Sequence, residues 1–302
     1  MSRVLGIDVG GTKVAIGVSG SDGPAFSERV RLDTGGDTLA RALAAARALD
    51  AAPSAVGFST CGVIRDGVVR LAPNVPGWEG LELPRLLREE YGAVPVAIDN
   101  DVNAAAAAEL RWGALRGVST GVYLNLGTGL AAAPVVDGRV VPGAHGAAGE
   151  IGYLQVTPGE PAFADGRVPL EERVSGSALA ARGTALLGRT TTAAELLHLS
   201  GRPVSAPATG RQARAVALVD EALRTLAMSV ANLCVVLDPE VLVVGGGMMG
   251  AAELILPRLA AELRRAVPFP PEVRAARFTD DAPLLGALAL AHTAAHAAGL
   301  SA

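Results

Sequence analysis

The segment from Asp8 to Lys13 combines a carboxylate, two glycines, a hydroxyl and the only lysine of the chain. Asp8 lies inside an apolar segment, where a carboxylate is costly unless it has a partner. Gly10 and Gly11 follow, and glycines let backbone N–H groups approach phosphate oxygens without a Cβ atom in the way. This spacing predicts a phosphate site with a metal-side carboxylate, and an ordinary hairpin turn is the structural alternative.

A second glycine cluster, Gly127-Thr128-Gly129, has with Ala132 the G-x-G-x-x-A spacing of dinucleotide-binding proteins. That motif must open a helix, whereas here the segment 134–136 continues as a strand. The context therefore excludes a dinucleotide-dependent oxidoreductase and leaves a hairpin turn able to bind phosphate. A third cluster, Gly245–Gly247, separates a strand from a helix, so it either admits a nucleotide base and ribose or forms a plain loop.

Asp99, Asn100 and Asp101 stand between a predicted strand and an Ala-rich helix. Polar residues at such a junction are often helix caps, but three exceed what capping requires. A carboxylate at a helix N-terminus is kept ionised by the helix dipole, which suits it to accept a proton from a hydroxyl that attacks phosphorus.

Two further acidic positions have the chemistry to bind a polyol. Glu150 lies among small residues, and Glu171 follows a segment rich in Pro, Gly and Ala that reads as a long loop, 157–169. Carboxylates can accept hydrogen bonds from sugar hydroxyls, although solvated surface acids are the more common case.

The pattern of apolar residues predicts strands and helices that hold these groups. Two strands, 3–9 and 14–18, flank the first glycine turn, and strand, glycine turn, strand, Asp-Gly turn and strand recur in the second half, which indicates two related lobes. Further strands are expected at 55–58, 94–98, 122–126, 134–136 and 241–244, and helices at 38–49, 102–110, 172–187, 211–237, 251–266 and 284–298.

Composition excludes several classes of protein. The chain has 302 residues, 50% hydrophobic, with a net charge of −4 and no basic block, so neither disorder nor a nucleic-acid footprint is indicated. Its two cysteines, Cys61 and Cys234, frame no disulfide scaffold, and the N-terminus lacks the apolar core of a signal peptide. We expect a cytoplasmic protein without a membrane span.

Eight ordered motifs strongly resemble the ROK family of sugar kinases and cover nearly the whole chain. They are Gly6-x-Asp8-x-Gly10-Gly11-Thr12-Lys13, Asn74-x-Pro76-Gly77-Trp78, Asn100-Asp101-x-Asn103-Ala104-Ala105, Leu126–Gly129, Ala148–Gly152, Leu170-Glu171 with Ser175-Gly176, Asp238-Pro239 and Gly245–Gly247.

The resemblance implies an α/β, actin-like (ribonuclease H-like) kinase with two lobes, and with the sugar and ATP in the cleft between them. The small N-terminal lobe would span 1–115, with a C-terminal helix at about 285–302 packing back on it. The large lobe would span 116–284. On this basis Asp101 is the general base. Asp8 lies on the Mg²⁺ side and would contact the ion indirectly, through phosphate or water. The other implied contacts are Asn74, Asn100, Asp101, Glu150, Tyr153 and Glu171 with the sugar, Gly10, Gly11, Thr12, Lys13, Gly127, Thr128 and Gly129 with phosphate, and Gly246 and Gly247 with adenosine.

Two departures from the family pattern stand out. Many bacterial members have a histidine where this chain has Tyr153, and a cysteine-rich run after it, whereas 158–171 contains no cysteine. Without these ligands a tetrahedral zinc site is not expected. The small-residue loop G-x-G-x-P-G appears as Gly57–Gly62 with Ser59 and Cys61 replacing its second glycine and its proline, either a substrate-side change or neutral drift.

The function that these features predict is ATP- and Mg²⁺-dependent phosphorylation of the 6-hydroxyl of glucose or a glucose-like hexose. An amino-sugar kinase acting on kanosamine, glucosamine or N-acetylmannosamine is the alternative within that class, since a few hydrogen bonds decide sugar specificity. A sugar-responsive regulator or a silent sugar-binding protein is the alternative of another class, but the chain starts at the phosphate strand, with no helix-turn-helix, and retains Asp8 and Asp101. Polyphosphate as the donor stays open: it would favour a basic track along the cleft, for which this acidic chain with one lysine shows no obvious candidate, although arginines could supply one. The resemblance to the family also implies a homodimer.

Overall fold

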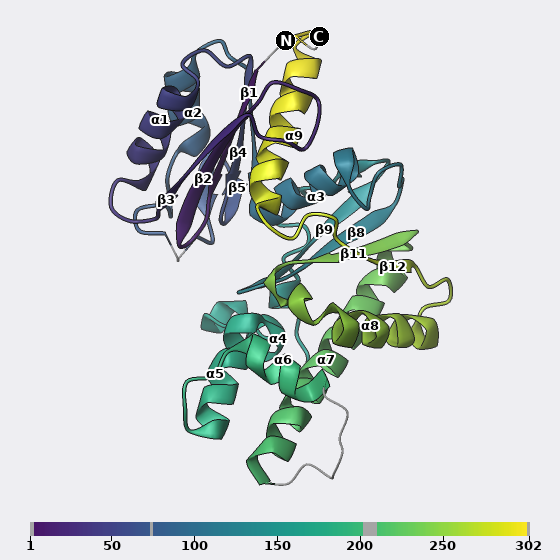
Figure 1. Cartoon of the computed structure of the whole chain (residues 1–302). Helices are drawn as coiled ribbons and strands as arrows, with labels where there is room; N and C mark the ends of the chain where they lie inside the picture. The colour runs from purple at the N-terminus through teal and green to yellow at the C-terminus, as the bar shows by residue number, and fades with distance from the viewer. Residues whose placement is uncertain (1–2, 73–74, 202–209, 301–302) are drawn as a thin grey trace. The chain divides into compact units, whose positions relative to one another are not determined.

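The computed structural model describes residues 3–72, 75–201 and 210–300 (Figure 1). The chain forms two compact units. Unit 1 comprises Met1–Gly117, Arg139–Ala148 and Asp280–Ala302, and unit 2 comprises Val118–Gly138 and Gly149–Thr279. Each unit has its own hydrophobic core. No helix within the described ranges has the length and apolar character to cross a bilayer.

Unit 1 is built on a five-stranded sheet of order β3-β2-β1-β4-β7. Strands β1 and β2 are antiparallel, and β1, β4 and β7 are parallel to one another. Helices α1 and α2 lie on one face of the sheet and α9 on the other, where α9 also packs against α3 (Figure 1). The bounds are β1 Val4–Val9, β2 Lys13–Ser19, β3 Glu28–Asp33, α1 Thr38–Leu49, β4 Ala55–Thr60, β5 Val63–Arg65, β6 Val68–Arg70, α2 Leu83–Tyr91, β7 Val96–Asn100, α3 Asp101–Trp112, β10 Arg139–Val140 and α9 Ala282–Ala297.

Helix α9 is a core element although it is the last helix of the chain. Its apolar residues surround the helix, which is typical of a buried helix. A Cβ atom at Gly286 would overlap the carbonyl oxygen of Ala104 in α3, and one at Gly57 in β4 would overlap the carbonyl oxygen of Ala287. Glycine at these two positions therefore allows α9 to approach both the sheet and α3 at backbone distance.

Unit 2 repeats this plan. Strands β9, β8, β11 and β12 lie in this order, with β8 and β9 antiparallel and β8, β11 and β12 parallel. The bounds are β8 Gly121–Leu126, β9 Leu130–Val136, the 3₁₀ helices η1 Ile151–Tyr153 and η2 Phe163–Asp165, α4 Glu171–Val174, α5 Gly176–Leu187, α6 Ala193–Gly201, α7 Gly210–Leu237, β11 Val241–Gly245, the 3₁₀ helix η3 Gly247–Ala251, α8 Ala252–Ala266 and β12 Glu272–Ala275.

Three features differ from the sequence prediction. The helix expected at 172–187 is interrupted at Ser175, which has an extended backbone and caps α5 by accepting a hydrogen bond from the Ala178 N–H group. The strand expected at 55–58 continues to Thr60 as the buried strand β4, so Ser59 and Thr60 of the segment 57–62 belong to a strand and not to a loop. Asp99 and Asn100, expected after a strand, are the last residues of β7.

Candidate functional site

Asp8 and Ser59 meet at the C-terminal edge of the unit 1 sheet. They lie directly opposite each other in the parallel strands β1 and β4. Ser59 Oγ donates a hydrogen bond to Asp8 Oδ1 at 2.8 Å, and Asp8 is 6% exposed. Burial raises the pKa of Asp8 to about 7, with Asp101 adding to the rise, while Ser59 and Lys13 oppose it. Ser59 is a partner that the sequence prediction missed, because only strand pairing brings it to Asp8.

Asp101 is the first residue of α3, directly after β7. The Val102 N–H group donates to Asp101 Oδ1 at 2.9 Å, and Asn100 caps the helix by accepting from the Asn103 N–H group at 2.7 Å. Burial raises the pKa of Asp101 to about 6. A carboxyl group with a pKa close to neutrality and a position at a helix N-terminus has the properties of a general base.

Asp99 has a different role from Asp101. Its Oδ1 accepts from the backbone N–H group of Asn100 at 2.9 Å and from Asn103 Nδ2 at 2.7 Å. Burial raises its pKa, and these hydrogen bonds oppose the rise. Asp99 thus holds the junction between β7 and α3 on which Asn100 and Asp101 are carried.

The first glycine turn is exposed at the same edge. Gly10 N donates to Lys13 O at 3.0 Å and closes the turn between β1 and β2, while Gly11, Thr12 and Lys13 are exposed. Unit 1 therefore brings together Asp8, Asn100, Asp101 and this turn. Asn74, predicted to bind the sugar, lies outside the described residues.

Magnesium fits the donor set of unit 1. Among the described residues, no group of three or more His, Cys, Asp or Glu side chains is arranged to hold a metal ion. Mg²⁺ usually takes only one or two carboxylates and completes its shell with waters and substrate phosphates. Asp8 supplies a carboxylate whose ionised form is disfavoured by burial, and a cation beside it would favour that form.

The second glycine turn is fixed in unit 2 by the start of α5. The N–H group of Gly176 donates to Gly127 O at 2.9 Å, and Ser177 Oγ donates to Thr128 O at 2.7 Å. A Cβ atom at Gly176 would lie 2.7 Å from Gly127 O, so a glycine is required for this approach. The turn between β8 and β9 is consequently held rigidly by backbone contacts.

A cavity of about 1090 Å³ opens beside this turn, within unit 2. Its lining is mostly apolar and contains one acidic residue, Glu253, but among the described residues no Lys or Arg. The lining residues are Gly127, Thr128, Gly176, Ser177, Thr192, Ala193, Ala194, Leu197, His198, Gly201, Gly247, Met248, Gly250, Ala251, Glu253 and Leu254. Gly247 was predicted at this place, whereas the wall from α6 was missed because the short helix gave no recognisable periodicity.

Gly246 shapes the cavity without lining it. Its φ of 93° is in the region that favours glycine, and a Cβ atom would overlap the carbonyl oxygen of Leu126. The backbone conformation of Gly246 therefore sets the course of η3, which forms part of the cavity wall.

Glu150, Tyr153 and Glu171 form the second predicted group of unit 2. Burial raises the pKa of Tyr153, and the charges of Glu150 and Glu171 add to the rise, so the three side chains are close. Glu171 Oε2 accepts from the Leu130 N–H group, next to the second glycine turn, at 2.7 Å. The Tyr153 ring contacts Phe163 edge to face, with 5.4 Å between ring centroids, and Phe163 is 63% exposed.

Comparison with known proteins identifies the relatives of this arrangement. The ROK family model matches residues 4–294. A glucokinase of Thermotoga maritima is 30% identical over 95% of this chain and 96% of its own length, and an N-acetylmannosamine kinase of Shigella flexneri is 32% identical over 95% and 98%.

Solved structures agree with this match. A ROK hexokinase of Thermus thermophilus superposes with a TM-score of 0.78 at 33% identity, covering 98% of this chain and 99% of that one. A ROK glucokinase of Streptomyces griseus in complex with glucose and AMPPNP gives a TM-score of 0.76 at 28% identity, covering 97% and 100%. The architecture is therefore the actin-like fold of these sugar kinases.

Proposed function

Because this chain belongs to the ROK family, we propose that it is an ATP-dependent kinase that phosphorylates the 6-hydroxyl of glucose or a glucose-like hexose. The observation that carries the proposal is Asp101, a partly buried carboxyl at the N-terminus of α3 with a pKa raised to about 6. Asp8 also has a raised pKa, but Ser59 Oγ already donates to its carboxyl, and we assign Asp8 to the Mg²⁺ side.

In the reaction that we propose, Asp101 accepts the proton of the sugar 6-hydroxyl as its oxygen attacks the γ-phosphorus of ATP. The bond between the γ-phosphorus and the β,γ-bridging oxygen breaks, and ADP leaves. Asn100, which caps α3, would orient the sugar beside Asp101. Positioning and charge stabilisation account for most of the catalysis in such transfers.

The cavity of unit 2 supports a nucleoside triphosphate as the donor. Its apolar walls suit a base and ribose, and the second glycine turn at its edge suits phosphate oxygens. Polyphosphate would instead require a track of cations, and the described lining of this cavity contains no Lys or Arg. The Streptomyces griseus relative, solved with AMPPNP, is consistent with ATP.

Mg²⁺ would be held on the Asp8 side, through phosphate or water. When bound, it neutralises charge on the transferring phosphoryl group. Ser59 holds the Asp8 carboxyl in a fixed orientation through Oδ1, and the exposed turn from Gly11 to Lys13 would contact the phosphates.

An amino-sugar kinase is the second candidate, and the acidic environment of Tyr153 favours it. Glu150 and Glu171 both act on the Tyr153 hydroxyl electrostatically, and the same two charges would attract a protonated amino group on the acceptor. The 32% identity to an N-acetylmannosamine kinase supports an amino-sugar derivative as the acceptor, but not the charge argument, because an N-acetyl group is uncharged.

The test is a coupled ADP-release assay with ATP and Mg²⁺ across glucose, mannose, fructose, glucosamine, N-acetylmannosamine and kanosamine. We expect turnover with glucose or one glucose-like sugar. Turnover restricted to an amino sugar would select the second candidate, and ADP release no faster than that of Asp101→Asn with every sugar would reject the kinase assignment for these acceptors.

A further inference from the structure

The loop between Tyr153 and Glu171 joins two residues that we expect to contact the sugar. It contains Pro158, Gly159 and Pro161, and apart from η2 it has no regular backbone structure. Its prolines fix their own φ angles, but without a regular helix or strand the segment does not by itself set the spacing of its two ends.

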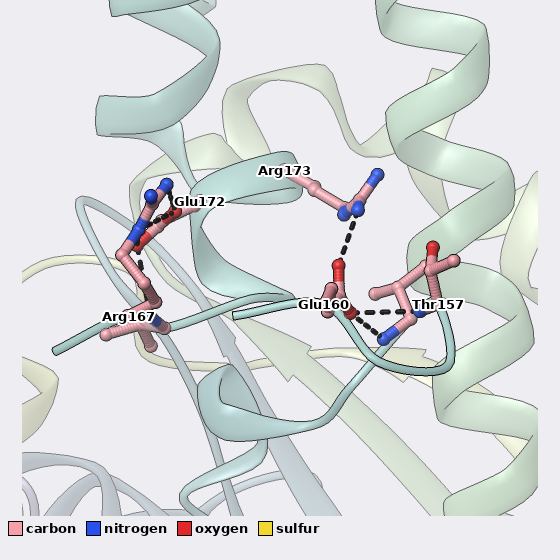
Figure 2. A network of polar contacts seen from close by, with 7 residues as sticks. Thr157, Glu160, Arg167, Glu172 and Arg173 are labelled. Atoms are coloured by element: carbon pink, nitrogen blue, oxygen red, sulfur yellow. Dashed lines mark hydrogen bonds and ion pairs between the residues drawn. The ribbon is translucent and has the colours of Figure 1, made fainter. Parts of the chain in front are cut away.

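Glu160, in the middle of this loop, contacts both sides of it (Figure 2). Its Oε1 accepts from the N–H group of Thr157 at 2.9 Å and from that of Val156, while its Oε2 accepts from Arg173 Nη2 at 2.6 Å. We call Glu160, Arg173 and the two N–H groups the Glu160 clasp. The Glu160 side chain is 12% exposed, and these hydrogen bonds lower its pKa to about 2, so the carboxylate is charged at every physiological pH.

Arg173 connects the clasp to Glu171, one of the two residues that we expect to contact the sugar. It lies in the four-residue helix α4, which Glu171 opens, and its carbonyl oxygen accepts from Arg182 Nη1 at 2.9 Å. Glu171 binds the Leu130 N–H group, and the residues after α4 hold the turn at Gly127 and Thr128. A shift of α4 would therefore move Glu171 relative to the second glycine turn.

The other ion pair of the loop is less able to do this. Arg167 and Glu172 form a bidentate pair (Figure 2), but their side chains are 54% and 37% exposed, and exposed pairs contribute little. Glu160 also binds two backbone N–H groups on the Tyr153 side of the loop, whereas Arg167 and Glu172 both lie at its Glu171 end.

We infer that Glu160 is a positioning residue for sugar recognition, which sets the spacing of Tyr153 and Glu171 by tying α4 to the start of the loop. This inference rests on the proposed function, because it assigns those two residues to the sugar. Glu160 itself touches neither substrate nor phosphate in this account.

The experiment compares Glu160→Gln with Glu160→Asp and with Glu262→Gln. The glutamine variant keeps the size of the side chain but removes the charge that Arg173 and two N–H groups require. The aspartate variant retains the charge and should recover part of the function. Glu262 is the matched control, since it forms an ion pair with Arg265 on α8, away from the loop.

In Glu160→Gln we expect KM for the sugar to rise by about tenfold while KM for ATP changes by less than twofold, with Glu160→Asp in between and Glu262→Gln unchanged. Equal changes in both KM values, or none, would overturn the inference, since a general loss of folding does not discriminate between the substrates.

Hydrogen exchange tests the same inference without activity. The Leu130 amide, bonded to Glu171, should exchange about tenfold faster in Glu160→Gln and at the wild-type rate in Glu262→Gln. An unchanged rate at Leu130 would overturn the positioning role. If the wild-type protein phosphorylates no sugar, the proposed function fails, while accelerated exchange at Leu130 would still establish that Glu160 positions Glu171.

Discussion

The strand ends of unit 1 carry carboxylates where those of unit 2 carry an amide and glycines. Asp8 stands two residues before Gly10, and Asn125 stands two residues before Gly127. In the neighbouring parallel strand, Asp8 faces Ser59, whereas Asn125 faces Gly245. Two sheets with matching strand order thus place different chemistry at matching positions.

This difference separates two tasks. The carboxylates of unit 1 titrate near neutral pH because they are buried, which suits proton transfer and a metal side. The glycines of unit 2 remove side chains and leave a cavity for a large ligand. The strand frame alone therefore specifies neither task; the residues at the strand ends do.

The largest effect is expected for Asp101→Asn, which removes the proposed base but keeps the shape of the side chain. We expect kcat to fall by about 10³-fold with little change in KM, because general base catalysis contributes on this scale. Asp99→Asn, two residues away, is the matched control and should lose less than about tenfold, since its role is structural. Similar losses in both variants would remove the distinction between them.

The next effect is expected for Asp8→Asn. Loss of the carboxylate should raise the Mg²⁺ concentration for half-maximal activity by about tenfold and lower kcat by about 10²-fold. A Mg²⁺ titration of the coupled assay measures both values. A variant with the wild-type Mg²⁺ dependence would show that Asp8 does not lie on the metal side.

A smaller effect is expected in unit 2, where Gly246 and Gly247 test conformation against contact. Gly246→Ala introduces strain at positive φ and an overlap with Leu126, so it should lower the melting temperature and raise KM for ATP by about tenfold. Gly247→Ala has open space for its methyl group, so it should leave the melting temperature unchanged and raise KM for ATP less. Equal melting temperatures for the two variants would contradict this account.

The smallest effect concerns stability and pH. Asp8 and Asp101 have folded-state pKa values of about 7 and about 6, above the value of 3.8 for an unperturbed Asp. Their protonated forms therefore stabilise the folded state below pH 3.8, and this contribution is lost as pH rises through 6 and 7. Asp8→Asn should consequently gain a few °C over the wild type at pH 8 and less at pH 5.

Differential scanning calorimetry of the two proteins at both pH values measures this difference, and other titrating groups cancel in the comparison. A gain that does not depend on pH would show that the pKa of Asp8 is not raised in the folded state, because the carboxyl would then be ionised in the folded and the unfolded chain at both pH values.

Much of the frame could be predicted from local patterns. Strands β1 and β2 with their glycine turn, helix α1 and the turn between β8 and β9 all have strong short-range signals. Strand β3 was missed because it is mostly exposed and polar, as edge strands often are. Helix α6 was missed because its nine residues are too few for a clear period.

The residues of the candidate site also differ in how readily they could be predicted from the sequence. Asp8, Asp101 and the glycine clusters were recognisable because each carries its chemistry within a few residues. Ser59, His198 and Glu253 were not, since each reaches the site only through contacts between segments far apart in the sequence. The Glu160 clasp joins residues 13 positions apart across an irregular loop, where no periodicity exists.

The backbone contacts of α9 with Gly57 and Ala104 also set an order of events during synthesis. The ribosome completes the strands of unit 1 long before it reaches residues 282–297, so the core face that α9 covers stays open while unit 2 is made. Unit 2 comprises Val118–Gly138 and Gly149–Thr279, so all of its residues are made before α9 and it can fold first. Strand β1 and helix α3, which carry Asp8 and Asp101, therefore acquire their contacts with α9 only near the end of translation.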